Sequence, residues 1–142
     1  MKAYLDSSFL FPLYAPDDHS PAATAEIKHF RGTLILSSLT ELELANALEL
    51  RVFRKELTRE QVDRAHAGFG SDIQLGTLTV FELEPAMFLR TRKLIRQTTS
   101  LLGCRTADIL HLGAALEAGA DRLFSFDQRQ KALARRMKLE TN

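Results

Sequence analysis

Met1-Lys-Ala-Tyr-Leu-Asp-Ser-Ser-Phe-Leu10 is the stretch that decides the fold. A short apolar run, residues 3–5, ends abruptly at Asp6, which is typical of a buried strand in a parallel sheet. Ser7 suits the N-cap of a following helix with an apolar face. Ligands of open α/β sheets bind outside the carboxyl ends of the strands, so Asp6 is a candidate metal or substrate ligand. The alternative is that Asp6 only caps the helix, and this segment alone does not decide between the two roles.

Length and composition indicate one ordinary globular domain covering residues 1–142. The chain is 45% hydrophobic and 26% charged, as in average folded domains. No apolar run approaches the roughly 20 residues that span a bilayer, and Asp6 interrupts any secretory signal. The single cysteine, Cys104, excludes an internal disulfide and a thiolate zinc cluster. We therefore expect a cytoplasmic protein without a membrane partner.

The charge is unevenly distributed although the net charge is only +1. Residues 90–142 carry 11 Lys or Arg against 5 Asp or Glu. Such a basic segment suits a polyanionic partner, but solvated helix faces explain it equally well.

Strand patterns and helix patterns alternate along the chain. Strands are expected at 3–5, 33–36, 77–81 and 122–126, with a short edge strand at 138–140. Helices are expected from Ser7 and at about 21–30, 39–55, 58–69, 85–97, 106–117 and 127–137. Loops are expected around Gly68, Gly70 and Gly76, and at 98–103. This alternation predicts an α/β fold in which helices cover both faces of a parallel sheet.

Two further acids occupy the same kind of position as Asp6. Asp127 directly follows the apolar residues 123–126. Asp108 lies in the first turn of an otherwise apolar helix, where a buried carboxylate is costly unless it is paired or bound to metal. Its alternative role is a favourable interaction with the helix dipole.

The helix that begins near Leu39 offers a fourth acid, either Glu41 or Glu43. Each of them interrupts apolar surface at helical spacing, so periodicity does not choose between them.

Four motifs together give the chain a resemblance to a known family. They are Tyr4-Leu-Asp-Ser-Ser8, Ser38-Leu-Thr-Glu-Leu-Glu-Leu-Ala-Asn-Ala47, Thr106-Ala-Asp-Ile-Leu-His-Leu-Gly-Ala-Ala115 and Leu123-Phe-Ser-Phe-Asp127. In this order they resemble the PIN domain, and within it the VapC toxins of toxin–antitoxin pairs. The resemblance implies a single α/β/α sandwich with a mostly parallel sheet of four to five strands.

The resemblance also implies which residues act. Asp6, Glu43, Asp108 and Asp127 match the acidic quartet of the family, and Glu43 is preferred to Glu41 because small residues follow it in the family's register. Ser8 matches a hydroxyl that supports the metal's water shell. Ser125 stands where the family usually has Thr or Ser.

Carboxylate oxygens without His or Cys ligands suit Mg²⁺ or Mn²⁺. Crowded acids would repel one another without a cation among them. We expect Asp6 and Asp108 to bind the metal directly, and Glu43 and Asp127 to hold metal-bound waters or a second ion. The family resemblance then implies hydrolysis of RNA that leaves a 5′-phosphate and a 3′-hydroxyl.

Two residues near Asp108 carry groups that can bind metal or phosphate. His111 follows it at a spacing that allows metal binding, but a packed histidine is the favoured interpretation on so apolar a helix. Arg105 adjoins the turn and is the best candidate for a contact to RNA phosphates.

Rival functions differ in their demands on the sequence. A haloacid-dehalogenase-type phosphatase needs a second Asp at position 8, which is Ser. The serious alternative is a PIN-fold protein that binds RNA or an antitoxin without cutting. The intact quartet favours the nuclease.

The resemblance finally implies a homodimer and a cognate VapB-like antitoxin. The antitoxin would lie across the acidic cleft and place an Arg or Lys among the carboxylates. Phe11, Leu13, Tyr14 and Phe53 are candidate contacts, although sequence alone does not separate them from the core.

Overall fold

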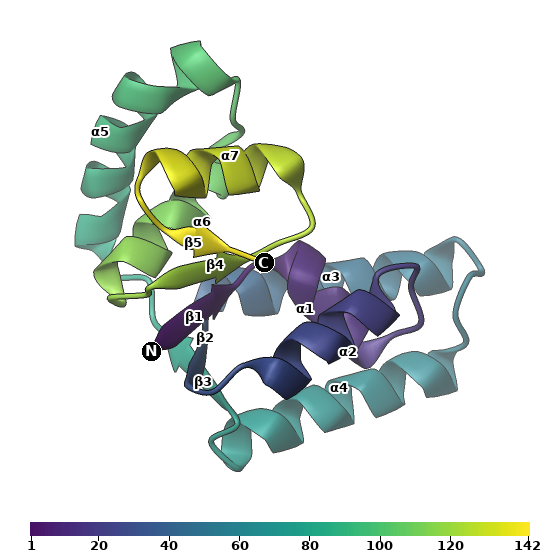
Figure 1. Cartoon of the computed structure of the whole chain (residues 1–142). Coiled ribbons are helices and arrows are strands. Elements are labelled where there is room, and N and C mark those ends of the chain that lie inside the picture. The colour runs from purple at the N-terminus through teal and green to yellow at the C-terminus, as the bar shows by residue number, and fades with distance from the viewer.

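A five-stranded, all-parallel sheet forms the centre of the computed structural model, which describes all residues 1–142. Its strands are β1 (Lys2–Leu5), β2 (Thr33–Ser37), β3 (Leu78–Phe81), β4 (Arg122–Phe124) and β5 (Glu140–Thr141). They lie in the order β3-β2-β1-β4-β5, so β1 is central (Figure 1). The expected parallel sheet of four to five strands is confirmed, and the edge strand begins two residues later than predicted.

Helices cover both faces of this sheet. They are α1 (Ser7–Tyr14), α2 (Ser20–His29), α3 (Ser38–Phe53), α4 (Arg59–Gln74), α5 (Pro85–Leu102), α6 (Thr106–Glu117) and α7 (Gln128–Arg136). Helices α1 to α4 lie on one side and α5 to α7 on the other (Figure 1). The fold is the expected α/β/α sandwich.

Alternation along the central strand divides the core into two clusters. Ala3 and Leu5 pack with α1 to α4, whereas Tyr4 packs with α5 to α7. Tyr4 pairs with Ile35 on β2 and Leu123 on β4, and both neighbours point to the same side as Tyr4. Because side chains alternate across a strand, one apolar run supplies both cores.

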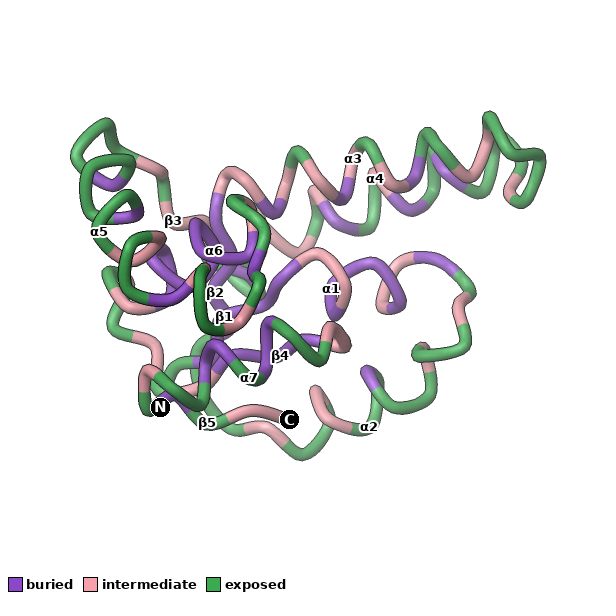
Figure 2. Tube along the Cα trace, turned by 90° about the horizontal axis from the view of Figure 1, so that it is seen from above, coloured by how far each residue is buried: buried purple, intermediate pink, exposed green.

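Helix α6 is the most deeply buried helix of the second layer. All residues from Asp108 to Ala115 are buried, while α5 is largely exposed on its outer side (Figure 2). The acid in the first turn of α6 is therefore buried, as its apolar surroundings predicted.

Two predicted helix boundaries were wrong, because packing overrides local propensity. Helix α4 continues through Gly68 and Gly70 to Gln74, since its buried stripe of Val62, Ala65 and Phe69 anchors it to the core. The loop predicted around Gly68 and Gly70 is therefore part of α4.

Helix α5 likewise continues through the residues that were predicted to form a loop. Thr98 is buried and its hydroxyl donates to the Leu94 carbonyl at 2.7 Å, which satisfies the side chain inside the helix. The helix ends at Gly103, whose φ of 64° is the left-handed conformation that glycine adopts readily.

The start of α1 also differs from the prediction. Asp6, not Ser7, is the N-cap, and its carboxylate accepts a hydrogen bond from the Phe9 amide at 3.0 Å.

None of the helices combines the length and the hydropathy needed to cross a membrane.

Replacing Leu48 with alanine should destabilise the fold strongly. Leu48 is fully buried where α3 joins the first core cluster, and such a truncation costs about 2–5 kcal/mol. Leu42 on the same helix is 70% exposed, so Leu42→Ala should change the free energy of unfolding by no more than about 0.5 kcal/mol. Urea denaturation measures both values, and equal losses would contradict this packing of α3.

Candidate functional site

The four predicted acids line one cavity at the carboxyl edge of the sheet. This acidic cavity has a volume of about 170 Å³. Its lining residues are Asp6, Ser7, Ser8, Glu43, Arg105, Ala107, Asp108, His111 and Asp127. Asp6 follows β1, Glu43 lies on the helix after β2, and Asp127 follows β4. The parallel topology thus brings together acids that are far apart in the sequence.

Asp6 is buried and held by three donors. Its Oδ1 accepts from the Ser8 hydroxyl at 2.7 Å and from the Phe9 amide at 3.0 Å. Its Oδ2 accepts from the hydroxyl of buried Ser125. Burial raises the pKa of Asp6 despite the opposing effect of these hydrogen bonds. Asp6 therefore caps α1 and also lines the cavity, so its role as a cap does not remove it from the cavity.

Ser8 and Ser125 connect the loops that follow β1 and β4. Their hydroxyl oxygens are 3.2 Å apart. The Phe126 amide donates to Ser8 Oγ at 2.9 Å, and the Asp127 amide donates to Ser125 Oγ at 3.0 Å. The two serines thereby link the loop that contains Asp127 to Asp6.

Arg105 lies between two of the acids. Its backbone N–H donates to Asp108 Oδ2 at 3.0 Å, and its Nε is 3.3 Å from the same oxygen. Its Nη2 is 3.4 Å from Asp108 Oδ1 and 3.4 Å from Asp127 Oδ2. The Arg105 side chain is 67% exposed, whereas that of Asp108 is 9% exposed. Arg105 thus supplies positive charge to the acidic cavity from its rim.

Glu43 is held by a histidine that the sequence analysis favoured as a packing residue. His111 is buried, as expected, but its Nε2 lies 2.6 Å from Glu43 Oε2. Its Nδ1 lies 2.9 Å from the Tyr4 hydroxyl, which is 2.7 Å from Ser37 Oγ. Partial burial has the largest single effect and raises the pKa of Glu43, but the hydrogen bond and charge of His111, together with Ser7 and Arg105, outweigh it, so the net pKa is lowered. The spacing between Asp108 and His111 gave no signal for this pairing with Glu43, which lies 68 residues from His111 in the chain.

Glu41, the alternative to Glu43, lies in a different place. It lines a separate cavity with Leu42, His66 and Phe69, between α3 and α4. Burial, followed by repulsion from Glu82, raises the pKa of Glu41. Only Glu43 of the two joins the other acids.

The carboxylates of the acidic cavity suit a hard divalent cation, although they are too far apart to form a ready-made metal site. Four carboxylates face the cavity, and oxygen donors of this kind suit Mg²⁺ or Mn²⁺. No three His, Cys, Asp or Glu side chains form a ready-made metal cluster. Arg105 instead pairs with Asp108 and Asp127. A cation would therefore have to displace or complement this arginine.

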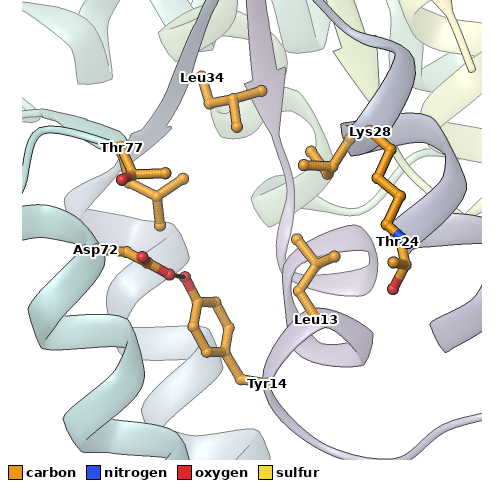
Figure 3. A pocket seen from close by; sticks show the side chains of 9 residues that line it. Leu13, Tyr14, Thr24, Lys28, Leu34, Asp72 and Thr77 are labelled. Carbon is orange, nitrogen blue, oxygen red and sulfur yellow. Dashed lines mark hydrogen bonds between the residues drawn. The ribbon is translucent and has the colours of Figure 1, made fainter.

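A larger cavity of about 340 Å³ lies between α1, α2, α4 and the edge of the sheet (Figure 3). Leu13 and Tyr14 face it, and the Tyr14 hydroxyl donates to Asp72 Oδ2 at 2.6 Å. This cavity is mainly apolar and contains one carboxylate, so it offers no acidic cluster. Among the predicted antitoxin contacts, Phe11 is buried in the core and Phe53 is 83% exposed.

Comparisons with known proteins agree with this architecture. The PIN domain family model matches residues 3–136. VapC20 of Mycobacterium tuberculosis, described as a sarcin-ricin loop cleaving toxin, has a TM-score of 0.72 at 15% identity, over 92% of this chain and 93% of that one. VapBC2 of Rickettsia felis, solved with promoter DNA, has a TM-score of 0.65 at 18% identity, over 100% and 98%.

FitAcB of Neisseria gonorrhoeae has a TM-score of 0.66 at 17% identity, over 98% of this chain and 95% of that one. A search of curated proteins found no match. At these identities the structural likeness establishes a shared fold.

The raised pKa of Asp6 predicts how Asp6→Asn changes stability with pH in metal-free buffer. The folded wild type binds this proton more tightly than the unfolded chain, so its stability falls as the pH rises from about 4 through the raised pKa. Asparagine does not titrate, so the variant should gain stability relative to wild type over that range.

Denaturation at several pH values in the presence of a chelator measures this gain. The control is Asp18→Asn, a change at an exposed carboxylate, which should leave stability within about 0.5 kcal/mol. A constant difference between wild type and Asp6→Asn across the pH range would contradict the burial of an ionisable Asp6.

Proposed function

Because this chain belongs to the PIN domain family, we propose that it is a metal-dependent endoribonuclease and the toxin of a VapBC-type toxin–antitoxin pair. One observation carries the proposal: four acids from separate elements line a single cavity at the carboxyl edge of the sheet. A buried acid such as Asp6 is costly unless a cation or donors compensate its charge. The cluster is therefore better explained by chemistry than by stability.

In this proposal Asp6 and Asp108 hold Mg²⁺ or Mn²⁺, which supplies Lewis-acid activation of water and stabilises the leaving oxygen. Ser8 and Ser125 orient Asp6 through their hydrogen bonds. Glu43, which His111 fixes in place, would hold a metal-bound water or a second ion. Asp127, whose amide donates to the Ser125 hydroxyl, would have the same role.

Arg105 has two roles in the proposed cycle. In the free protein it neutralises part of the charge on Asp108 and Asp127. With a cation bound at the acids, the exposed Arg105 guanidinium would be free to contact a phosphate of the RNA. The products are a 5′-phosphate and a 3′-hydroxyl.

The proposed partner is a VapB-like antitoxin that places an Arg or Lys among the carboxylates. The internal pairing of Arg105 supports this, because it illustrates that a guanidinium satisfies the acids of the cavity. The structural likeness of this chain to VapBC2 and FitAcB further supports a partner of this kind.

The competing proposal is a PIN-fold protein that binds RNA or an antitoxin without cutting. The quartet favours the nuclease, since binding alone does not require four acids that line one cavity.

Loss of individual acids should abolish cleavage selectively. Asp6→Asn and Glu43→Gln should each reduce the cleavage rate by about a thousandfold, because metal activation contributes several kcal/mol. The matched control is Glu41→Gln on the same helix, which should cut RNA at the wild-type rate because Glu41 faces another cavity. The assay uses labelled RNA with Mn²⁺ or Mg²⁺, and maps the ends of the products.

Equal cleavage by wild type and Asp6→Asn would reject the enzyme and leave the binding protein. Cleavage that persists in excess chelator would reject the proposed metal dependence.

The proposed homodimer is tested separately by light scattering. The purified protein should have twice the 16.0 kDa mass of the chain. A mass of one chain at all concentrations would contradict the dimer.

A further inference from the structure

A second cavity adjoins the acidic cavity and shares part of its wall. This side cavity has a volume of about 440 Å³. It shares Ser7, Ser8 and Asp127 with the acidic cavity. Its remaining lining residues are Phe11, Asp17, His19, Ala47, Arg51 and Phe126. A ligand that occupies the acidic cavity therefore has room to extend into the side cavity.

A stack of aromatic rings runs from the core to this cavity. The buried Phe9 ring lies 5.2 Å from that of Phe126, with an angle of 15° between their planes. The Phe126 ring lies 4.2 Å from that of His19, at an angle of 8°. His19 is exposed, and its backbone N–H donates to Asp17 Oδ1 at 2.9 Å. The stack thus ends in an exposed flat ring on a fixed backbone.

The polar wall of the side cavity carries no surplus positive charge. Arg51 lies over the Phe11 ring, 4.9 Å from its centroid. It also pairs with Asp17 at 3.2 Å and with Glu56 at 3.0 Å. With Asp127 nearby, this wall disfavours a phosphate. It suits a neutral, planar, hydrogen-bonding group instead.

We propose that the His19–Phe126 stack binds an unpaired base of single-stranded RNA, next to the phosphodiester in the acidic cavity. The inference rests on the proposed ribonuclease function and adds the site that selects single-stranded substrate. Every base offers a flat face for stacking, and bases are free to stack on protein rings only where they are unpaired. The shared wall favours RNA over an isolated aromatic side chain of a protein, because one nucleic acid strand supplies a phosphate and a base side by side.

The test measures binding rather than cleavage, with Mg²⁺ present, in a Glu43→Gln parent that keeps Asp6 and Asp108. Fluorescence anisotropy follows short labelled single-stranded RNAs, each intact or with one abasic nucleotide in turn. Adding His19→Ala should weaken binding of intact RNA about tenfold, the size of one lost stacking contact. His19→Phe should bind close to the parent, because it retains a flat ring. The matched control is His29→Ala, an exposed histidine on α2, which should not change the affinity.

Abasic RNAs make the test specific. At one position the missing base should weaken binding by the parent, and His19→Ala should then add no further loss. This coupling is not expected from a structural role of His19, and an unchanged thermal midpoint of His19→Ala excludes misfolding.

Unchanged RNA affinity in His19→Ala would overturn the inference, and so would losses that add at every abasic position. Weakened binding of an antitoxin peptide alone would also overturn it, in favour of a protein ligand. If the wild type shows this coupling between His19 and one base but never cleaves RNA, the nuclease proposal is overturned and the base-binding site is still supported.

Discussion

The structure depends on one buried carboxylate, that of Asp6, at the end of the central strand. Its oxygens accept hydrogen bonds from Ser8 and the Phe9 amide on one side and from Ser125 on the other. The same contacts cap α1 and join the loops that follow β1 and β4. Because the charge is desolvated, these donors have to be in place for the edge of the sheet to form. The geometry of the acidic cavity follows from that requirement.

The remaining acids are satisfied in different ways, and this explains how the fold tolerates them together. Asp108 and Asp127 share Arg105, which approaches from solvent. Glu43 relies on His111, which is fixed in turn by Tyr4 on the central strand. The second core cluster therefore reaches the acidic cavity through Tyr4 and His111, so that packing on one face of the sheet orients an acid on α3.

In the two proposals, the residues of the acidic cavity cleave RNA and those of the side cavity bind one of its bases. The acids come from the ends of strands and the first two turns of helices, next to the sheet. His19 and Asp17 come from the connection between α1 and α2, which is more exposed. Differences in RNA preference can thus arise in that connection while the acids keep their positions.

The sequence alone determined the alternating strands and helices, the parallel sheet and the acids that end its strands, because apolar periodicity and strand ends are local signals. Helical periodicity alone left Glu41 and Glu43 equivalent, since α3 contacts both α1 and α4 and both residues interrupt apolar surface, and the family resemblance made the choice of Glu43. It also ended α4 and α5 too early, because glycine and threonine propensities are weak beside a buried helical stripe. Only the tertiary structure paired His111 with Glu43 and Arg105 with Asp127, since those contacts join residues that are far apart along the chain.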